Sequence, residues 1–145
     1  MFYCIKRASF FFLACLFTVS LPAQPGCDAE DLLKKNVTKL DAYKFIKYFP
    51  VETNKQTEKV EYSYVLNGDT KYRLLVIDKG TKGEKMMVTV RDRAKKIVAT
   101  NKDRQNRTYS EVMDFTCPAT GVYFFEARFE GDIRDCGLNI LGFQK

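Results

Sequence analysis

The sequence predicts a mainly β protein: an antiparallel β-sandwich of jelly-roll or Greek-key type with one N-terminal helix. About seven or eight short segments alternate apolar and polar residues, and turn residues separate them about every eight to twelve positions. No helical stretch lies between consecutive strands. A parallel sheet needs such crossover connections, so a parallel α/β fold is excluded.

Residues 28–40 (DAEDLLKKNVTKL) carry the expected helix, which should end near Asp41. Apolar residues recur in this segment at spacings of four, four and three, which places them on one helix face: Ala29, Leu33, Val37 and Leu40. Three carboxylates lie in the first turn: Asp28, Glu30 and Asp31. They complement the positive end of the helix dipole, an interpretation that we prefer to a metal site.

Four β-favouring segments follow in order, the first in the connecting segment and the other three in the body of the expected sandwich: 43–51, 60–66, 71–78 and 85–91. The first is rich in aromatic residues and stops at Pro50, and a polar loop follows it. Apolar residues alternate in the second, and the turn 67–69 (NGD) joins it to the third. A glycine-containing loop precedes the fourth, which has Met86, Val88 and Val90 on one side.

Four more strands complete the expected sandwich: 97–100, 108–117, 122–130 and 137–143. In the second of these, alternate residues share one face: Tyr109, Met113, Phe115 and Cys117. The third (VYFFEARFE) is the clearest half-buried strand, with these residues inward: Tyr123, Phe125, Ala127 and Phe129. The last strand has Leu138 and Ile140 in phase.

The first 23 residues have the layout of a secretory signal peptide. Lys6 and Arg7 form a positive n-region, residues 8–19 are apolar, and Ala23 is a small residue at the expected cleavage site. The apolar run of about 12 residues is shorter than the roughly 20 that a transmembrane helix needs. We therefore expect a secreted, periplasmic or envelope protein without a transmembrane segment after cleavage. Lipidation at Cys27 fits less well, because the preceding residues do not form a lipobox.

Cleavage after Ala23 removes 23 of the 145 residues and leaves 122, a length that suits one domain. Residues 24–59 would form the helix and a connecting segment, and residues 60–145 the body of the sandwich. The signal peptide takes Lys6 and Arg7 with it and no acidic residue. The net charge then falls from +6 to +4, so the exported chain is only mildly basic.

Three cysteines remain after cleavage: Cys27, Cys117 and Cys136. In an oxidising compartment an odd number indicates one disulfide and one free thiol. Cys117 ends one strand and Cys136 begins the strand after the next, so a plain hairpin separates them by most of a strand, at about 3.3 Å per residue. A disulfide needs Cα atoms about 4.4–6.8 Å apart. This favours Cys27 with Cys136 and a buried Cys117, and leaves Cys117 with Cys136 as the alternative.

The sequence contains no histidine. Ser-His and Cys-His nucleophilic pairs and histidine metal sites are therefore excluded, and we assign no catalytic, cofactor-binding or metal-binding residue. A hydrolase would have to use carboxylates, and six are candidates: Glu111, Asp114, Glu126, Glu130, Asp132 and Asp135. A solvated outer sheet face accounts better for the first four. For the last two, a turn accounts for them about as well as a calcium site.

Residues 91–107 carry seven basic and two acidic residues. A patch for nucleic acid or anionic glycan is one interpretation. The basic residues fall, however, in two turns at opposite ends of one short strand, so we expect no single patch and no nucleic-acid partner. Five tyrosines could stack on sugars, but their alternation with polar residues favours a place in the core: Tyr62, Tyr64, Tyr72, Tyr109 and Tyr123.

The segment 115–123 (FTCPATGVY), followed by 136–143 (CGLNILGF), resembles the end of a group of uncharacterised small secreted β-sandwich proteins of Bacteroidota type. The pattern of Pro118, Gly121 and Tyr123 between two strands is also similar to bacterial pre-peptidase C-terminal domains, which are accessory β-sandwiches of secreted enzymes. The resemblance covers roughly residues 60–143. It implies a β-sandwich and an accessory role rather than catalysis.

These observations together predict a secreted, non-enzymatic β-sandwich that binds a glycan or an envelope protein at the cell envelope or outside the cell. No cofactor is expected. The alternatives are a carboxylate-dependent hydrolase and a structural envelope subunit. A long exposed edge strand that pairs with partners would distinguish a structural subunit.

Overall fold

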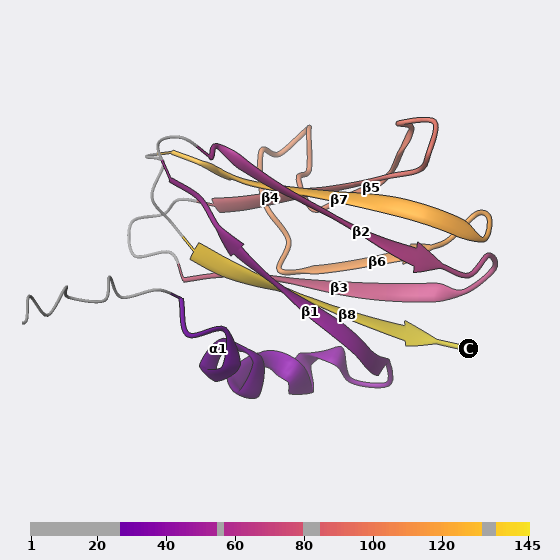
Figure 1. Cartoon of the computed structure of the whole chain (residues 1–145), viewed down its shortest axis with the longest axis horizontal. Coiled ribbons are helices and arrows are strands. Elements are labelled where there is room, and N and C mark those ends of the chain that lie inside the picture. The colour runs from indigo at the N-terminus through magenta and orange to yellow at the C-terminus, as the bar shows by residue number, and fades with distance from the viewer. Residues whose placement is uncertain (1–26, 55–56, 80–84, 132–135) are drawn as a thin grey trace, which may run out of the picture.

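The computed structural model describes residues 27–54, 57–79, 85–131 and 136–145. The expected signal peptide and the residues Asp132 and Asp135 lie outside the described residues. Eight strands form two four-stranded antiparallel sheets that pack face to face (Figure 1). The β-sandwich predicted from the sequence is thus confirmed.

Sheet A contains, in spatial order, β1 (Lys44–Glu52), β8 (Cys136–Gln144), β3 (Lys71–Asp78) and β6 (Val112–Thr116). Sheet B contains β2 (Lys59–Leu66), β7 (Gly121–Glu130), β4 (Lys85–Arg91) and β5 (Ile97–Thr100). The neighbours β1 and β8, β2 and β7, β3 and β6, and β4 and β5 are nested antiparallel pairs. This is the order of a jelly roll, in which one long antiparallel ribbon wraps into two sheets.

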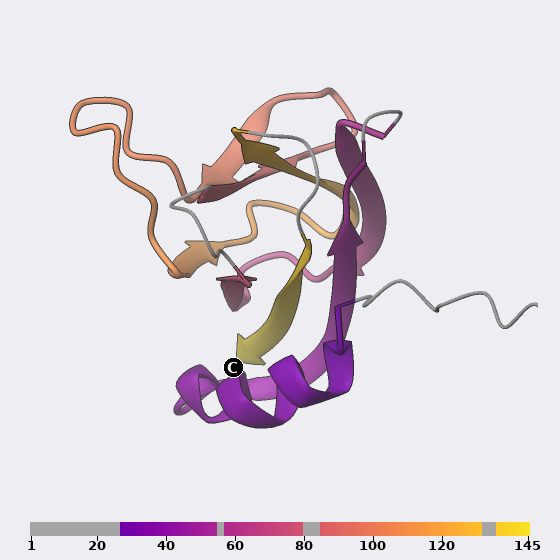
Figure 2. The same cartoon turned by 90° about the vertical axis from the view of Figure 1, so that its left-hand side faces the viewer.

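A helical segment covers part of the outer face of sheet A (Figure 2). It consists of α1 (Ala29–Asn36) and the 3₁₀ helix η1 (Val37–Leu40). Asp28 caps α1, because its Oδ1 accepts a hydrogen bond from the backbone N–H of Asp31 at 3.0 Å. Leu40 packs on outward apolar residues of β3 and β8: Leu75, Ile77, Leu138 and Ile140. β8 is therefore buried on both faces, which explains its nearly continuous apolar sequence.

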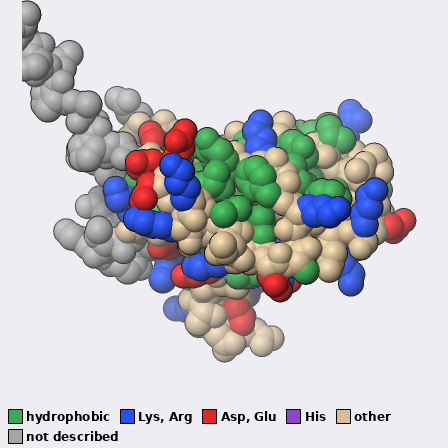
Figure 3. Space-filling view, turned by 90° about the horizontal axis from the view of Figure 1, so that it is seen from below, with side chains coloured by type: hydrophobic (Ala, Val, Ile, Leu, Met, Phe, Trp, Pro, Cys, Tyr) green, Lys and Arg blue, Asp and Glu red, His purple; other side chains and the backbone are tan. Residues whose placement is uncertain are grey.

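Gly142 permits the close approach of η1 to β8. A Cβ atom at this position would lie 2.9 Å from Leu40 Cδ2 and 3.1 Å from the carbonyl oxygen of Lys44. The coverage by the helix is partial, since no residue of α1 is fully buried. Seen from this side, apolar side chains gather near the middle of the face, with lysine and arginine side chains around them (Figure 3).

The main core lies between the sheets. Its fully buried residues come from both sheets and include Leu66, Leu74, Val88, Val90, Phe125 and Leu141. Phe49 of sheet A stacks on Tyr62 of sheet B with 3.8 Å between ring centroids, and Tyr62 stacks on Phe125 at 5.1 Å. This aromatic stack joins the two sheets near the side formed by β1 and β2.

A polar pair interrupts this core beside the aromatic stack. Asn139 of β8 is fully buried, and the hydroxyl of Tyr62 is buried too. Within the described part of the chain, neither the hydroxyl nor the Asn139 amide makes a hydrogen bond. Burial raises the pKa of Tyr62. These buried polar groups lack the hydrogen bonds that would offset their desolvation, so they lower the stability of the fold.

A disulfide links Cys27 to Cys136, with 5.6 Å between the Cα atoms, and Cys117 is a free, fully buried thiol. The favoured pairing of the sequence analysis is thus confirmed. The bond ties the residue before the Asp28 cap to the first residue of β8. The helical segment is therefore anchored to sheet A covalently at one end and by the packing of Leu40 at the other.

Two strand boundaries in the sequence analysis are wrong. β1 is an edge strand of sheet A and not part of a connecting segment, and it continues through Pro50 to Glu52, since proline is tolerated in edge strands. The strand expected at 108–117 begins only at Val112. Here the buried side chain of Asn101 accepts from the N–H of Val88 at 2.7 Å and donates to the carbonyl of Ser110 at 3.2 Å, in place of regular strand pairing.

Candidate functional site

A hollow of about 650 Å³ lies at one end of the sandwich, between the β4–β5 turn and the β6–β7 turn. We call it the end hollow. Its apolar lining comes from Ile97 and Val98 on β5 and from Pro118, Ala119 and Val122 around the start of β7. Arg93 and Lys96 of the β4–β5 turn line it as well. The end hollow thus combines aliphatic surface with two exposed cations.

Hydrogen bonds within the β4–β5 turn fix the backbone that carries these two cations. Asp92 uses its backbone and its carboxylate within the turn: its Oδ1 accepts from the N–H of Lys96 at 2.9 Å. Lys95 adopts a positive φ of 64° and places its Nζ 4.3 Å from the centroid of the Phe124 ring, on the outer face of sheet B. Arg93 and Lys96 make no ion pair with any described residue. Their charges are therefore open to an anionic group.

The opposite wall of the end hollow is fixed by hydrogen bonds to a third turn. The N–H of Gly68, between β2 and β3, donates to Thr120 Oγ1 at 2.8 Å, and the N–H of Asp69 donates to the carbonyl of Cys117 at 2.9 Å. A Cβ atom on Gly68 would lie 3.0 Å from the backbone nitrogen of Thr120, so a larger residue would push the two turns slightly apart. The wall is therefore preformed.

The buried side chain of Tyr123 supports the same wall from inside the sandwich. Its hydroxyl donates to the carbonyl oxygen of Ala119 at 2.7 Å, and the thiol of Cys117 donates to the same oxygen at 3.1 Å. Burial raises the pKa of Tyr123 to about 12. The phenol consequently stays protonated at neutral pH and acts as a hydrogen-bond donor rather than as a base.

A second polar cluster lies at the opposite end of the sandwich and joins the 101–109 loop to β7. Lys102 Nζ lies 2.6 Å from Glu130 Oε1, and Tyr109 donates to the other carboxylate oxygen. Lys102 and Tyr109 lower the pKa of Glu130, while burial and the bond to Glu130 raise the pKa of Tyr109. This cluster therefore ties the 101–109 loop to the end of β7.

Glu130 is expected to make the protein less stable at low pH. Its pKa is lowered in the folded state, so its stabilising contribution is present above the unfolded pKa of about 4.3 and is lost as the pH falls through the folded value. We expect Glu130→Gln to reduce the drop in Tm between about pH 6 and pH 3, measured by circular dichroism. Glu52→Gln, at an exposed position of β1, is the control. Equal acid sensitivity of the Glu130→Gln variant and the wild type would contradict this role.

The four described carboxylate candidates do not converge. Glu111 and Asp114 belong to sheet A and its β6 loop, whereas Glu126 and Glu130 lie on β7 of sheet B. Each pairs with its own cation, in order Lys39 at 3.2 Å, Arg73 at 2.7 Å, Lys59 at 2.9 Å and Lys102 at 2.6 Å. Since paired carboxylates for glycoside hydrolysis must face one substrate from both sides, these four do not form such a site.

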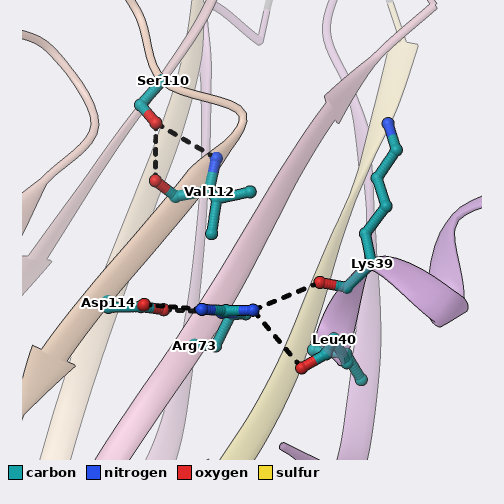
Figure 4. A network of polar contacts seen from close by, with 6 residues as sticks. All are labelled: Lys39, Leu40, Arg73, Ser110, Val112 and Asp114. Carbon is teal, nitrogen blue, oxygen red and sulfur yellow. Dashed lines mark hydrogen bonds and ion pairs between the residues drawn. The ribbon is translucent and has the colours of Figure 1, made fainter. Parts of the chain in front are cut away.

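Arg73 shows how these pairs serve the fold (Figure 4). Its guanidinium forms two parallel hydrogen bonds of 2.7 Å to Asp114 and reaches the backbone carbonyls of Lys39 and Leu40 at 3.5 Å. It also lies 4.5 Å from the ring centroid of Tyr43. The Arg73–Asp114 pair therefore connects β3 and β6 to η1.

The basic stretch 91–107 is divided as the sequence suggested. Four of its basic residues lie at the β4–β5 turn and three in the loop after β5: Arg91, Arg93, Lys95 and Lys96, and Lys102, Arg104 and Arg107. Among the five tyrosines, Tyr72 and Tyr123 are buried, and Tyr62 and Tyr64 pack against the main core. The expectation for Tyr109 is wrong: it lies outside β6, because Glu130 and the isolated bridge to Lys102 hold it in the loop.

The end hollow could not be predicted from the sequence, although both turns that form it were predicted. Residues 92–97 and 116–123 meet only because β4 and β7 are neighbours and β5 follows β4 at the sheet edge. That order is not visible in the local pattern. The available indication was that a basic turn and a Pro-x-x-Gly turn both interrupt strands in the second half of the chain.

No protein-family model matches the sequence. No curated protein matches it at a significant level either. Across the described ranges, no helix is long and apolar enough to cross a membrane. The same ranges contain no cluster of three or more cysteine, aspartate or glutamate residues suited to a metal ion.

Proposed function

We propose that the protein is a non-enzymatic binding module that acts at the cell envelope or outside the cell and uses the end hollow to bind a segment of another protein. The observation that carries this proposal is the pairing of aliphatic surface with the unpaired cations Arg93 and Lys96 in one preformed hollow. The Cys27–Cys136 disulfide supports a location outside the reducing cytosol.

The lining favours a peptide over a glycan. Sugar sites commonly present an aromatic ring to the ligand, but Tyr123, the aromatic residue of the lining, is only 3% exposed. Aliphatic surface with adjacent cations suits a segment that carries apolar side chains and a carboxylate, either from an acidic residue or from a chain end. An envelope protein with such a segment is the partner class that we propose.

The test is a binding screen of the purified, disulfide-bonded protein on an array of peptides with acidic and apolar residues and on a glycan array that includes uronic acids. We expect binding to a subset of the peptides. Arg93→Glu/Lys96→Glu should weaken that binding at least about tenfold, since a charge-assisted hydrogen bond contributes roughly 1.5–3 kcal/mol. Fluorescence anisotropy with the selected peptides measures the change.

The matched control is Lys34→Glu/Lys79→Glu, which changes the net charge equally at two exposed positions outside the hollow lining. It should bind the selected peptides like the wild type at physiological salt. Equal weakening by both double variants would show a nonspecific charge effect. Binding to uronic-acid glycans alone, or turnover of a substrate without any binding partner, would contradict the proposed function.

A further inference from the structure

The four edge strands of the sandwich differ in how well they are protected from pairing with another chain. β5 and β6 are short, with four and five residues. β1 has nine residues, but a register shift between Phe45 and Lys47 and the proline at position 50 interrupt its edge. Short strands, bulges and prolines are the usual means by which native edges avoid intermolecular pairing.

β2 has none of these protections. It contains eight residues, pairs with β7 without a register shift and includes no proline or glycine. The backbone groups on its free side make no hydrogen bond to any described residue. β1 and β2 lie along one side of the sandwich, opposite β5 and β6 (Figures 1 and 2). The free edge of β2 is thus a template for one more strand.

The side chains along β2 show what the added strand should carry. Val65 is the most exposed large apolar residue described, at 60%. On the inner face, Tyr62 and Tyr64 pack on the core with only part of their surface buried. An added strand would therefore gain most if it offered apolar or aromatic residues at alternate positions and no acidic residue opposite Glu61.

β2 itself meets this description. In an antiparallel pair of two β2 strands centred on Tyr62, Tyr62 faces its own copy and Val60 faces Tyr64, which are favourable aromatic and β-branched pairs. On the outer face, Glu61 lies opposite Ser63 and Lys59 opposite Val65, so like charges do not meet. The ammonium of Lys59 pairs with Glu126 of its own chain, and its apolar stem would lie against the partner's exposed valine. If the pair were instead centred on Glu61, each Glu61 would lie opposite its own copy, and the two like charges would destabilise the pair.

We propose that two copies of the protein associate through β2 in this register and extend sheet B into a continuous eight-stranded sheet. The interface has two-fold symmetry, as in most homodimers. One strand pair with its flanking side chains is small for a protein interface, so the association is expected to be transient, with a Kd on the order of 10–100 μM. This proposal is independent of ligand binding at the end hollow.

The register predicts opposite effects of opposite charges at position 65, because each copy's residue 65 faces the partner's Lys59. Val65→Lys should weaken association and Val65→Glu should strengthen it, each by roughly three- to thirtyfold over the two symmetric pairs. Sedimentation equilibrium of the purified protein from about 1 μM to 1 mM, at low and high salt and without peptide, measures both. High salt should reduce both effects.

Val112→Lys and Val112→Glu are the matched controls, since Val112 is an exposed valine of the edge strand β6 at 37% exposure. They should leave the association unchanged. Oxidative cross-linking gives the register directly: a mixture of Glu61→Cys and Ser63→Cys proteins should form the mixed dimer in preference to either like pair. A wild type that stays monomeric up to about 1 mM, the same sign for both Val65 variants, or equal effects at Val112 would overturn the proposal.

Discussion

Replacing Cys27 and Cys136 by serine is expected to lower the free energy of unfolding by about 3–5 kcal/mol. The disulfide closes a chain segment with a sequence separation of 109. Joining residues this far apart removes much conformational freedom from the unfolded chain, and the loop-entropy relation gives about 4.7 kcal/mol for a loop of roughly 100 residues. The helical segment should also detach more readily from sheet A. The sequence contains no tryptophan, so urea unfolding followed by far-ultraviolet circular dichroism is the suitable measurement.

Two controls separate the effect of the cross-link from the effect of the substitutions. Wild-type protein reduced with dithiothreitol should match the double serine variant. Cys117→Ala removes a buried free thiol and should cost at most about 1–2 kcal/mol, with no dependence on reductant. If reduction left the urea midpoint of the wild type unchanged, the disulfide would not contribute to stability.

The sequence predicted the sheets well because the period-two alternation follows burial between two layers. Val60, Tyr62 and Tyr64 of β2 and Tyr123, Phe125 and Ala127 of β7 all point toward the other sheet, as expected. β3, β4 and β5 also begin and end where the pattern placed them. The length of the strand between Cys117 and Cys136, with a hairpin assumed to follow it, favoured the observed disulfide without excluding the alternative.

Features that depend on distant partners were not predictable. Nothing in the local sequence distinguishes Asn139, which is buried and unpaired, from an asparagine at a turn. Pro50 lies in a strand because β1 has a free edge, and Tyr109 leaves the core because Glu130 binds it from another strand. The end hollow likewise arises from two turns brought together by strand order. The local sequence pattern therefore predicts where the strands lie, whereas the end hollow depends on the order of the strands in the sheets.

The same topology separates two surfaces with different chemistry. The end hollow lies at the turns that follow β4 and β6 and offers two unpaired cations, while β2 offers unpaired backbone groups along the side of the sandwich. Sheet A has its outer face partly covered by the helical segment, whereas no described helix covers sheet B. Both the end hollow and the edge of β2 therefore border sheet B.

Phe125→Ala is expected to destabilise the protein by about 3–5 kcal/mol, because it removes a fully buried aromatic side chain and leaves a cavity. Phe125 stacks on Tyr62, which in turn stacks on Phe49 of the other sheet. Its loss therefore weakens the contact between the sheets as well as the burial of one ring. The urea midpoint and the slope of the unfolding transition measure the change.

The neighbouring Phe124 provides a matched control of the same residue type on the same strand. Its side chain points to the outer face of sheet B, is only half-buried and contacts Lys95 through its ring. Phe124→Ala should cost about 1 kcal/mol or less, from partial burial and one exposed cation–π contact. Similar losses for the two variants would contradict the assignment of the inward and outward faces of β7, and with it the register that builds both the core and the wall of the end hollow.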